Sequence, residues 1–398
     1  MESEYSDNLD LIDDFEVEDP QNELDGLLVS VEDFDGLVLA PSDWTVWTIY
    51  DQIGRQIDLD PAFQRRDVWS RRAKSQFIES IFLGVPIPQI LLSSKKNSRN
   101  EFLVLDGKQR LTTIKEFFDG KYTDGKLFRL RGLSVLDDEL SGKTWQQIEK
   151  TDDWRNRFRN ATIRTAVLRG WQNEAVLYEI FHRLNAGSVR LSPMELRMSL
   201  HPGPFLKFII SWTSDIGPIH KILNKNTPDQ RMRDVELAIR FLAFSDRDIQ
   251  YSGNLKKFLD DCSLEYNGKF DDENYQKIIV SKLNDLNLAI EEGINIFPPR
   301  NFSKKWSGSN YEFRFNRAIF DVLVGSLSNA DFRKWAHDNP RSVENAFKKL
   351  CMEDKNFVRA IESTTKTPEN TRKRFESWYT AVAEVSGIDL EVPNIKPE

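Results

Sequence analysis

The stretch F-L-V-L-D-G-K-Q-R-L-T-T-I-K-E-F-F-D-G, residues 102–120, predicts a strand, a turn and a helix in direct succession. Four consecutive apolar residues, 102–105, indicate a buried strand, and Asp106-Gly107 is typical of a turn. A helix is predicted over 108–118, before Gly120, because apolar side chains recur there at helical spacing: Leu111, Ile114, Phe117 and Phe118. This junction sets the expected fold of the region around it.

The sequence on either side extends this pattern. Ser70 is a suitable N-cap for a helix that ends at Gly84, and the stretch P-I-P-Q-I-L-L after it predicts a strand. Helical patterns dominate after residue 200, for example over 231–245, 273–291, 310–328 and 369–386. The predicted fold is therefore α+β, with short strands and helices first and a mainly α-helical domain after them.

Charge divides the chain unevenly. Residues 1–54 hold 16 Asp and Glu and no Lys or Arg, whereas the remainder holds 55 basic and 47 acidic residues, a balance of +8. We predict an acidic, mostly disordered tail over 1–40, an α+β domain over 41–200 and a helical domain over 201–390. The acidic segment is either a solvated tail or an arm that covers the basic body or docks on a partner. The charge of residues 55–398 is compatible with DNA binding, although this part of the chain is not strongly basic.

Several classes of protein are disfavoured by the sequence. The two cysteines, Cys262 and Cys351, form neither a disulfide framework nor a metal cluster. There is no secretory signal and no apolar run of membrane-spanning length, so we expect a cytoplasmic protein without a membrane partner. The motifs of P-loop nucleotidases, α/β-hydrolases and zinc proteases are absent from the sequence.

The turn at residues 106–110 predicts an anion site. Backbone N–H groups and the positive end of the helix dipole meet there, and Gly107 allows a ligand to approach the backbone closely. Lys108 and Arg110 add positive charge, and arginine binds phosphate through two donors. Asp106 could hold Mg²⁺, orient Arg110 or act as a base, and Gln109 could position water. The structural alternative is a capping box, with Asp106 as N-cap and Gln109 at the third helical position.

Two further segments contain candidate DNA or cleft contacts. In F-Q-R-R-D-V-W-S-R-R-A-K, residues 63–74, bases interleave with aromatic residues, a pattern that fits nucleic acid; the bases considered are Arg65, Arg66, Arg71, Arg72 and Lys74. In residues 180–197 the candidates are Arg183, Asn185, Arg190 and Arg197. The structural alternatives are a solvated basic helix face for the first segment and a polar helix corner for the second.

The order of these motifs resembles the N-terminal domain of GmrSD-type modification-dependent restriction enzymes. The resemblance covers roughly residues 45–200, and it is carried by F-Q-R-R-D-V-W-S (63–70), I-E-S-I-F-L-G-V-P-I-P (78–88), L-D-G-K-Q-R-L-T-T-I (105–114), I-F-H-R-L-N (180–185) and L-S-P-M-E-L-R (191–197). It implies a ParB/sulfiredoxin-like core, a D-G-[QK]-Q-R signature associated with nucleotide binding and hydrolysis, and a role in restriction of phage DNA.

The family signature falls on Asp106, Gly107, Gln109 and Arg110, while its upstream Q-R pair falls on Gln64 and Arg65 and its R-x-N asparagine on Asn185. Lys108 stands where many members carry Gln, and its charge is expected to preserve phosphate binding. The C-terminal HNH nuclease domain of larger members is not recognisable in this sequence. The best histidine for it is His337 in W-A-H-D-N-P-R, which lacks convincing partners.

Three functions remain open from the sequence. The first is an NTP-binding and hydrolysing module of a restriction or anti-phage system that contacts DNA, with Mg²⁺ accompanying the nucleotide. Asp106, Gln109 and Arg110 would then be catalytic, and the phosphate-binding residues would be Gln64, Arg65, Gly107, Lys108 and Arg110. The second is a ParB-like metal-dependent nuclease. The third is a non-catalytic subunit that binds DNA or a partner, such as a nuclease or another component of the defence system.

Overall fold

The computed structural model describes residues 30–57, 59, 69–95, 98–173, 176–177, 179–180, 183, 193–298, 300–362 and 367–396. The described residues up to Pro202 form one compact unit, and those from Gly203 onward form a second. Each unit is described by itself. None of the helices in this described part of the chain is both long and apolar enough to cross a membrane.

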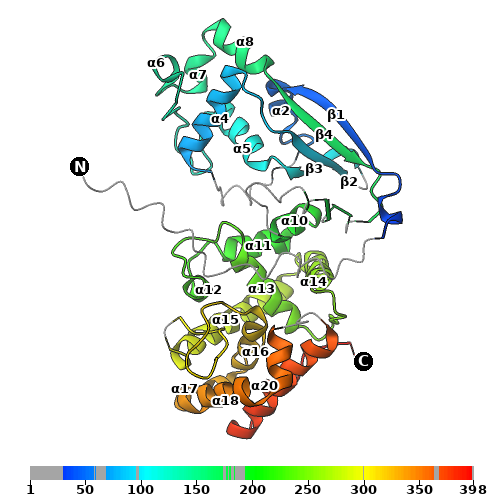
Figure 1. Ribbon diagram of the computed structural model, residues 1–398, viewed down its shortest axis with the longest axis vertical. Coiled ribbons are helices and arrows are strands. Elements are labelled where there is room, and N and C mark those ends of the chain that lie inside the picture. Colours follow the sequence, from blue (N-terminus) through cyan, green and yellow to red (C-terminus); the bar gives the residue numbers. More distant parts are fainter. Residues whose placement is uncertain are drawn as a thin grey trace, which may run out of the picture. The chain divides into compact units, whose positions relative to one another are not determined.

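The first unit is built on a four-stranded sheet (Figure 1). Its strands are β1 (Val38–Thr45), β2 (Ile90–Lys95), β3 (Ser98–Asp106) and β4 (Thr162–Arg169). They lie in the order β1-β4-β2-β3, with β2 and β4 parallel and the two outer pairs antiparallel. The sheet and the helices of this unit confirm the α+β prediction.

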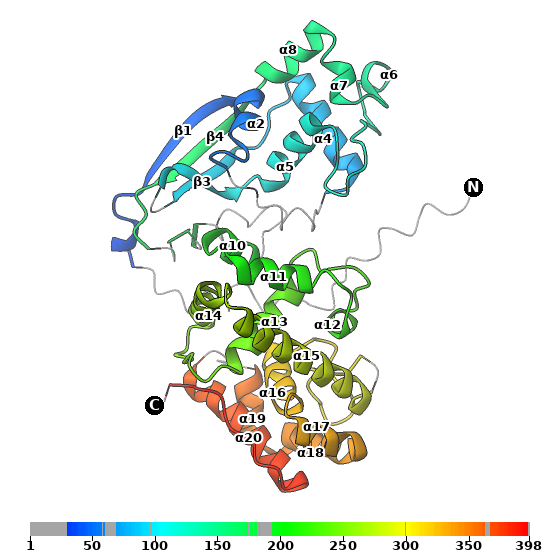
Figure 2. The same ribbon diagram turned by 180° about the vertical axis from the view of Figure 1, so that it is seen from behind.

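Helices pack against this sheet. They are α2 (Val46–Gln52), α4 (Arg71–Leu83), α5 (Lys108–Asp119), α6 (Asp137–Leu140), α7 (Trp145–Ile148), α8 (Asp152–Asn160) and α10 (Pro193–Leu200), with a short 3-10 helix at Glu32–Phe34. Figure 2 shows α4 and α5 beside each other on one side of the sheet, and α10 packs against β3. The strand β1 begins at Val38, two residues before the predicted end of the acidic tail.

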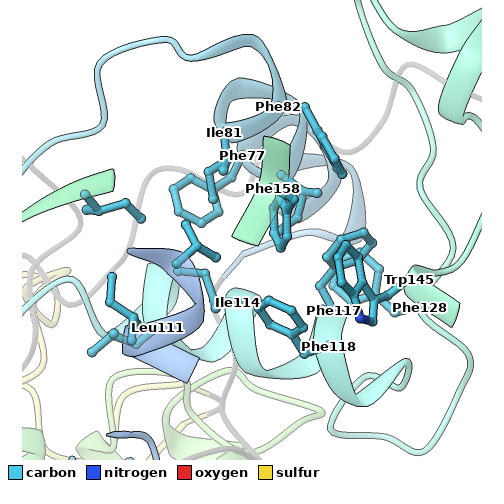
Figure 3. Close-up of a cluster of buried hydrophobic side chains, with 14 of the residues drawn as sticks. Phe77, Ile81, Phe82, Leu111, Ile114, Phe117, Phe118, Phe128, Trp145 and Phe158 are labelled. Carbon is cyan, nitrogen blue, oxygen red and sulfur yellow. The ribbon is translucent and has the colours of Figure 1, made fainter. Parts of the chain in front are cut away.

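Aromatic side chains form the core between the sheet and its helices (Figure 3). Phe82 of α4, Phe117 of α5 and Phe158 of α8 are fully buried, and the ring centroids of Phe82 and Phe158 lie 4.8 Å apart. Trp145 of α7 packs 5.3 Å from Phe158. Contacts between three or more rings fix the angles between helices, because each ring fills a space that its neighbours define. The core thereby holds the start of α5 in a defined position.

The predicted ends of α4 are confirmed. The side chain of Ser70 accepts a hydrogen bond from the Ala73 N–H at 3.2 Å, as an N-cap does. Gly84 follows the helix in the left-handed conformation with φ 71°, which glycine adopts without a steric penalty. The helix therefore begins and ends where local sequence signals place it.

A buried carboxylate joins α4 to the segment that precedes α6. Glu79 is only 4% exposed, and backbone N–H groups of residues 134–136 donate to it at 2.7–2.9 Å. Burial alone would raise the pKa of Glu79, but these donors outweigh it and hold the pKa below its ordinary value. Ionised Glu79 therefore stabilises this segment.

Replacing Glu79 by Gln is expected to lower the free energy of unfolding at pH 7 by about 2–3 kcal/mol, because three donors lose a charged acceptor. A depressed folded-state pKa contributes stability above the unfolded pKa, which is about 4.3, and that contribution is lost as the pH falls through the folded value. The difference between wild type and variant should therefore shrink below about pH 4.3, as measured by urea unfolding. The exposed Glu139→Gln is the control, and an equal effect of both variants would contradict this account.

The second unit is helical, as predicted. Its helices are α11 (Pro204–Trp212), α12 (Pro218–Ile222), α13 (Arg233–Phe244), α14 (Leu255–Lys269), α15 (Glu273–Ile296), α16 (Arg317–Leu327), α17 (Ala330–Asp338), α18 (Pro340–Glu353), α19 (Lys355–Glu362) and α20 (Pro368–Ser386). Every residue of α13 is buried, so this helix forms the centre of the unit.

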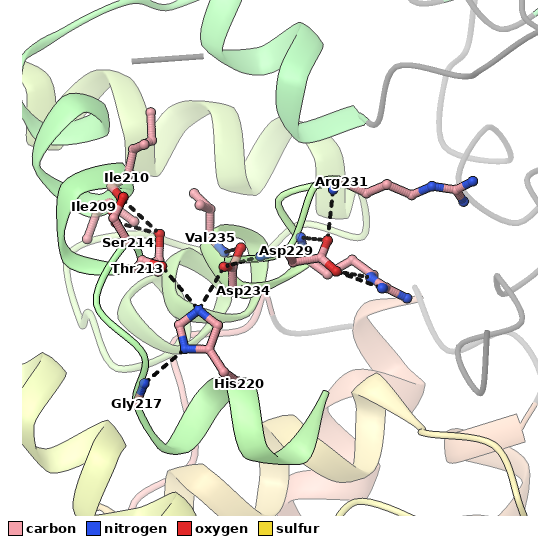
Figure 4. A network of polar contacts seen from close by, with 11 residues as sticks. Ile209, Ile210, Thr213, Ser214, Gly217, His220, Asp229, Arg231, Asp234 and Val235 are labelled. Atoms are coloured by element: carbon pink, nitrogen blue, oxygen red, sulfur yellow. Dashed lines mark hydrogen bonds and ion pairs between the residues drawn. The ribbon is translucent and has the colours of Figure 1, made fainter. Parts of the chain in front are cut away.

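Buried polar groups tie α12 to the start of α13 (Figure 4). His220 is fully buried, and its Nδ1 accepts a hydrogen bond from the Gly217 N–H at 3.0 Å. Its Nε2 lies 3.1 Å from both the Thr213 carbonyl oxygen and Asp234 Oδ2. Since Nδ1 accepts, the proton of the neutral ring is on Nε2, where both neighbours are acceptors. This histidine is a structural connection rather than a catalyst.

A second buried pair precedes α13. Asp229 accepts hydrogen bonds from Arg233 Nε at 3.0 Å and Nη2 at 2.6 Å, and from the Arg231 and Arg233 N–H groups. Burial alone would raise the pKa of Asp229, but Arg233 and the N–H groups hold it below its ordinary value. The turn into α13 is thus fixed by charge as well as by packing.

Candidate functional site

The strand–turn–helix junction lies where the sequence places it. The strand β3 ends at Asp106 and the helix α5 begins at Lys108, with Gly107 between them as the N-cap residue. Gly107 has φ 96°, and a Cβ added to it would lie 3.1 Å from Ile90 Cγ1. The backbone conformation therefore favours glycine here, and a larger residue would also have to displace the Ile90 side chain slightly.

The predicted capping box at this junction is wrong. Asp106 is still paired with Leu91 as the last residue of its strand, so it cannot be the N-cap. Its Oδ1 accepts the Gly107 N–H at 2.7 Å, and its Oδ2 accepts Arg110 Nη2 at 2.8 Å. Because the N-cap is a glycine, no side chain caps α5 at that residue.

Arg110 binds the protein itself. Its Nη1 donates to the Pro88 carbonyl and, at 3.1 Å, to the Gln89 carbonyl, while its Nη2 holds Asp106. The residue is 9% exposed. Arg110 thus connects the first turn of α5 to the segment before β2, and it acts on the site by positioning Asp106 and the turn.

The first turn of α5 has an unusual charge for a helix start. Lys108 and Arg110 lie in it and no acidic residue does, although the helix dipole favours acids at this end. Gln109 adds an unsatisfied acceptor, because its Oε1 is buried without a hydrogen-bond partner among the described residues. Arg110 is already paired with Asp106 at 2.8 Å, and a water or ligand donor would satisfy the Gln109 acceptor.

The described residues do not form a metal site around Asp106. They contain no group of three or more His, Cys, Asp or Glu side chains that could hold a metal ion. Both carboxylate oxygens of Asp106 already accept hydrogen bonds. His337, the histidine considered for an HNH nuclease, pairs with Glu292 through Nδ1 at 3.0 Å and is largely exposed.

Lys74 was wrongly predicted as a DNA or cleft contact. It is 1% exposed, and its Nζ pairs with Glu116 of α5, which also accepts from the Thr123 N–H at 2.8 Å. Burial lowers the pKa of Lys74, and Glu116 opposes this effect. The helical spacing that makes Lys74 look like part of a basic face in fact directs it into the unit, against α5.

The neighbouring arginines lie at the surface. Arg71 is partly exposed, pairs with Asp124 and lies over the Tyr122 ring at 4.7 Å from its centroid. Arg72 is exposed. Arg183 is also exposed and pairs with Glu179 at 2.6 Å. Other predicted contacts lie outside the described residues: Gln64, Arg65, Arg66, Asn185 and Arg190.

Five further bases, which the sequence reasoning did not single out, lie close to Arg71 and Arg72. They are exposed and belong to the segment after α5 and to the turn before α7: Lys121, Lys126, Arg129, Arg131 and Lys143. The signal for part of this set is the alternation F-R-L-R over 128–131, in which Phe128 and Leu130 are buried. Alternation places the two arginines together on the outer side.

The comparisons with known proteins agree with the motif pattern. Residues 46–202 match the model of a family described as the GmrSD restriction endonuclease, N-terminal domain. No curated protein and no solved structure matches the chain. The match covers less than half of the 398 residues but includes the whole junction at 106–110. It indicates a component of a restriction or anti-phage system. Residues 46–202 are therefore similar to the N-terminal domain of GmrSD restriction endonucleases, and the resemblance predicted from the sequence is confirmed.

Proposed function

We infer that residues 106–110 bind the phosphates of a nucleoside triphosphate and promote its hydrolysis, in a restriction-type module that also contacts DNA. The observation that carries this proposal is the start of α5, where Lys108 lies in the first turn and no side chain caps the helix at Gly107. Gln109 Oε1, buried and without a hydrogen-bond partner in the part of the chain that the structure describes, adds a group for positioning water. The family match covers residues 46–202 and therefore includes this segment.

Each residue has a distinct role in this proposal. Lys108, at the start of α5 and partly exposed, binds phosphate as a point charge. Gly107 lets the phosphate approach the backbone N–H groups of the helix start. Arg110 keeps its bonds to Asp106 and to the Pro88 and Gln89 carbonyls, so it is a positioning residue.

Hydrolysis then requires a placed water molecule. Gln109 Oε1 accepts a hydrogen bond from that water, whose oxygen attacks the γ-phosphorus while the bond to the β-phosphate oxygen breaks. The products are a nucleoside diphosphate and inorganic phosphate, and the proton of the attacking water passes to solvent or phosphate. Stabilisation of phosphate charge by Lys108 and the helix N-terminus is the main catalytic effect. The Mg²⁺ that accompanies a nucleotide is treated as part of the substrate.

The binding step is tested by calorimetry with each Mg–NTP and the full chain. Lys108→Ala is expected to weaken nucleotide binding by roughly 10–100-fold, because a charge-assisted hydrogen bond contributes about 1.5–3 kcal/mol. The matched control is Lys115→Ala on the same helix, where Lys115 pairs with Asp119 at 2.5 Å. Equal affinity of Lys108→Ala and wild type would contradict phosphate binding at this turn.

A further inference from the structure

A group of exposed bases lies on the first unit apart from the start of α5. We define the loop surface as Arg72 of α4, Lys121, Lys126, Arg129 and Arg131 of the segment between α5 and α6, and Lys143 before α7. All six residues are exposed. In Figure 1 the segment between α5 and α6 lies beside α4, so residues distant in sequence share one region of this unit.

Hydrogen bonds connect the segments that carry the loop surface. The Arg131 N–H donates to Ser75 Oγ of α4 at 3.2 Å, and a Cβ on Gly132 would lie 3.2 Å from the Arg72 side chain. Arg129 Nη1 donates to the Gly142 carbonyl at 2.9 Å, next to Lys143. Backbone bonds between Leu130 and residues 142–143 fix the two segments together. These contacts hold the segment 129–132 against α4 and against residues 142–143.

The acids near the loop surface fall into two groups: Glu116 and Glu79 are engaged inside the unit, whereas Asp124 and residues 137–139 are exposed. Asp124 pairs with Arg71 and lies 3.9 Å from Lys126. Glu116 pairs with the buried Lys74, and Glu79 is buried under residues 134–136. The exposed acids 137–139 of α6 border the surface at one end. The loop surface itself holds six bases, one of which, Lys126, pairs with Asp124 at 3.9 Å.

The exposure of the aromatic residues near the loop surface indicates which kind of nucleic acid the surface would bind. Its aromatic residues are unavailable for base stacking, since Tyr122 is 5% and Phe128 0% exposed. Proteins that hold single strands usually offer aromatic rings to the bases, whereas contact with a duplex is dominated by Lys and Arg on phosphates. We propose that the loop surface binds the phosphate backbone of double-stranded DNA without reading its sequence.

This inference deepens the proposed function by assigning its DNA contact to particular residues, and it is independent of the nucleotide site. Binding at the loop surface needs no nucleotide, so it can be measured alone. If the chain binds DNA through these residues but hydrolyses no nucleotide, only the function of residues 106–110 fails. If nucleotide turnover is normal and DNA binding does not depend on these residues, only the present inference fails.

The test compares two triple variants of the full chain by fluorescence anisotropy with a duplex of about 25 base pairs. Lys126→Ala/Arg129→Ala/Arg131→Ala should weaken binding at least roughly tenfold, and the slope of log K against log salt should fall by about 2–3, because each lost phosphate contact contributes about 0.9. The control, Lys277→Ala/Lys334→Ala/Arg341→Ala, removes three exposed bases of the helical unit and the same total charge.

Equal weakening by both variants would contradict the inference, because it would reduce the effect to overall charge. Tighter binding of a single strand or of duplex RNA than of duplex DNA would contradict the choice of partner. Vesicles that contain anionic lipid test the membrane alternative, since Leu127 beside the surface is 53% exposed. Binding to such vesicles, with none to DNA, would overturn the proposal. Calorimetric melting of both variants confirms that each is folded.

Discussion

Replacing Gln109 by Met is expected to lower NTP turnover by roughly 100-fold while leaving the protein as stable as wild type or slightly more stable. The loss follows from removing the acceptor that places the attacking water, an effect within the usual range of about 10²–10⁴ for a group that assists proton transfer or orients water. Stability should not fall, because Gln109 Oε1 is buried and has no partner among the described residues. An apolar side chain of similar length replaces an unsatisfied acceptor at no cost.

The measurement is kcat and KM for the nucleotide that turns over fastest, with the melting temperature recorded on the same samples. A role in placing water predicts a lower kcat with little change in KM. Gln109→Glu is the useful second variant, because it keeps an acceptor at this position and should retain part of the activity. If the kcat of Gln109→Met equals that of wild type, Gln109 has no role in the hydrolysis step.

Arg110→Ala is expected to lower the free energy of unfolding of the first unit by about 2–4 kcal/mol, a fall of roughly 5–15 °C in its melting temperature. The residue is 9% exposed and holds Asp106 together with the Pro88 and Gln89 carbonyls, so its removal leaves all three acceptors without their charged donor. Nucleotide turnover should be lost as well, because the turn at Gly107 loses the bonds that fix it.

Scanning calorimetry of the full chain gives the melting temperature of each unit. The control is again Lys115→Ala, since a surface pair at this spacing contributes only about 0.3–0.5 kcal/mol. An unchanged melting temperature for Arg110→Ala, with nucleotide binding abolished, would show that Arg110 binds ligand instead of positioning the turn. That outcome would restore the role predicted for it from the sequence.

Local sequence signals were sufficient to predict the ends of several helices in the first unit. Ser70 and Gly84 mark the ends of α4, and the apolar period after Lys108 gives α5 within one residue, because capping and helical spacing act within a single element. The strand β1 was missed, since it contains Pro41 and exposes most of its residues, and so shows no alternation. It is stabilised as a strand by pairing with β4, far away in the chain.

The roles of the charged residues could not be read from the sequence in the same way. Arg110 looks like a phosphate ligand until the segment with Pro88 and Gln89 is placed beside it. Lys74 looks like a surface base until α5 brings Glu116 against it. Both partners come from other elements, and a single sequence contains no information on which elements will pack together. The position of the junction was predictable, but the role of each charged residue within it was not.

The central claim, that residues 106–110 bind and hydrolyse a nucleotide, is tested most directly by NTP hydrolysis. The full chain is assayed with Mg²⁺ and ATP, GTP, CTP or UTP, with and without duplex DNA, beside Gln109→Met and Lys115→Ala. We predict turnover of at least one nucleotide by wild type and Lys115→Ala, and a loss of roughly 100-fold in Gln109→Met. Folded wild-type protein that neither binds nor hydrolyses any of the four would contradict the claim and favour a subunit that only binds DNA or a partner.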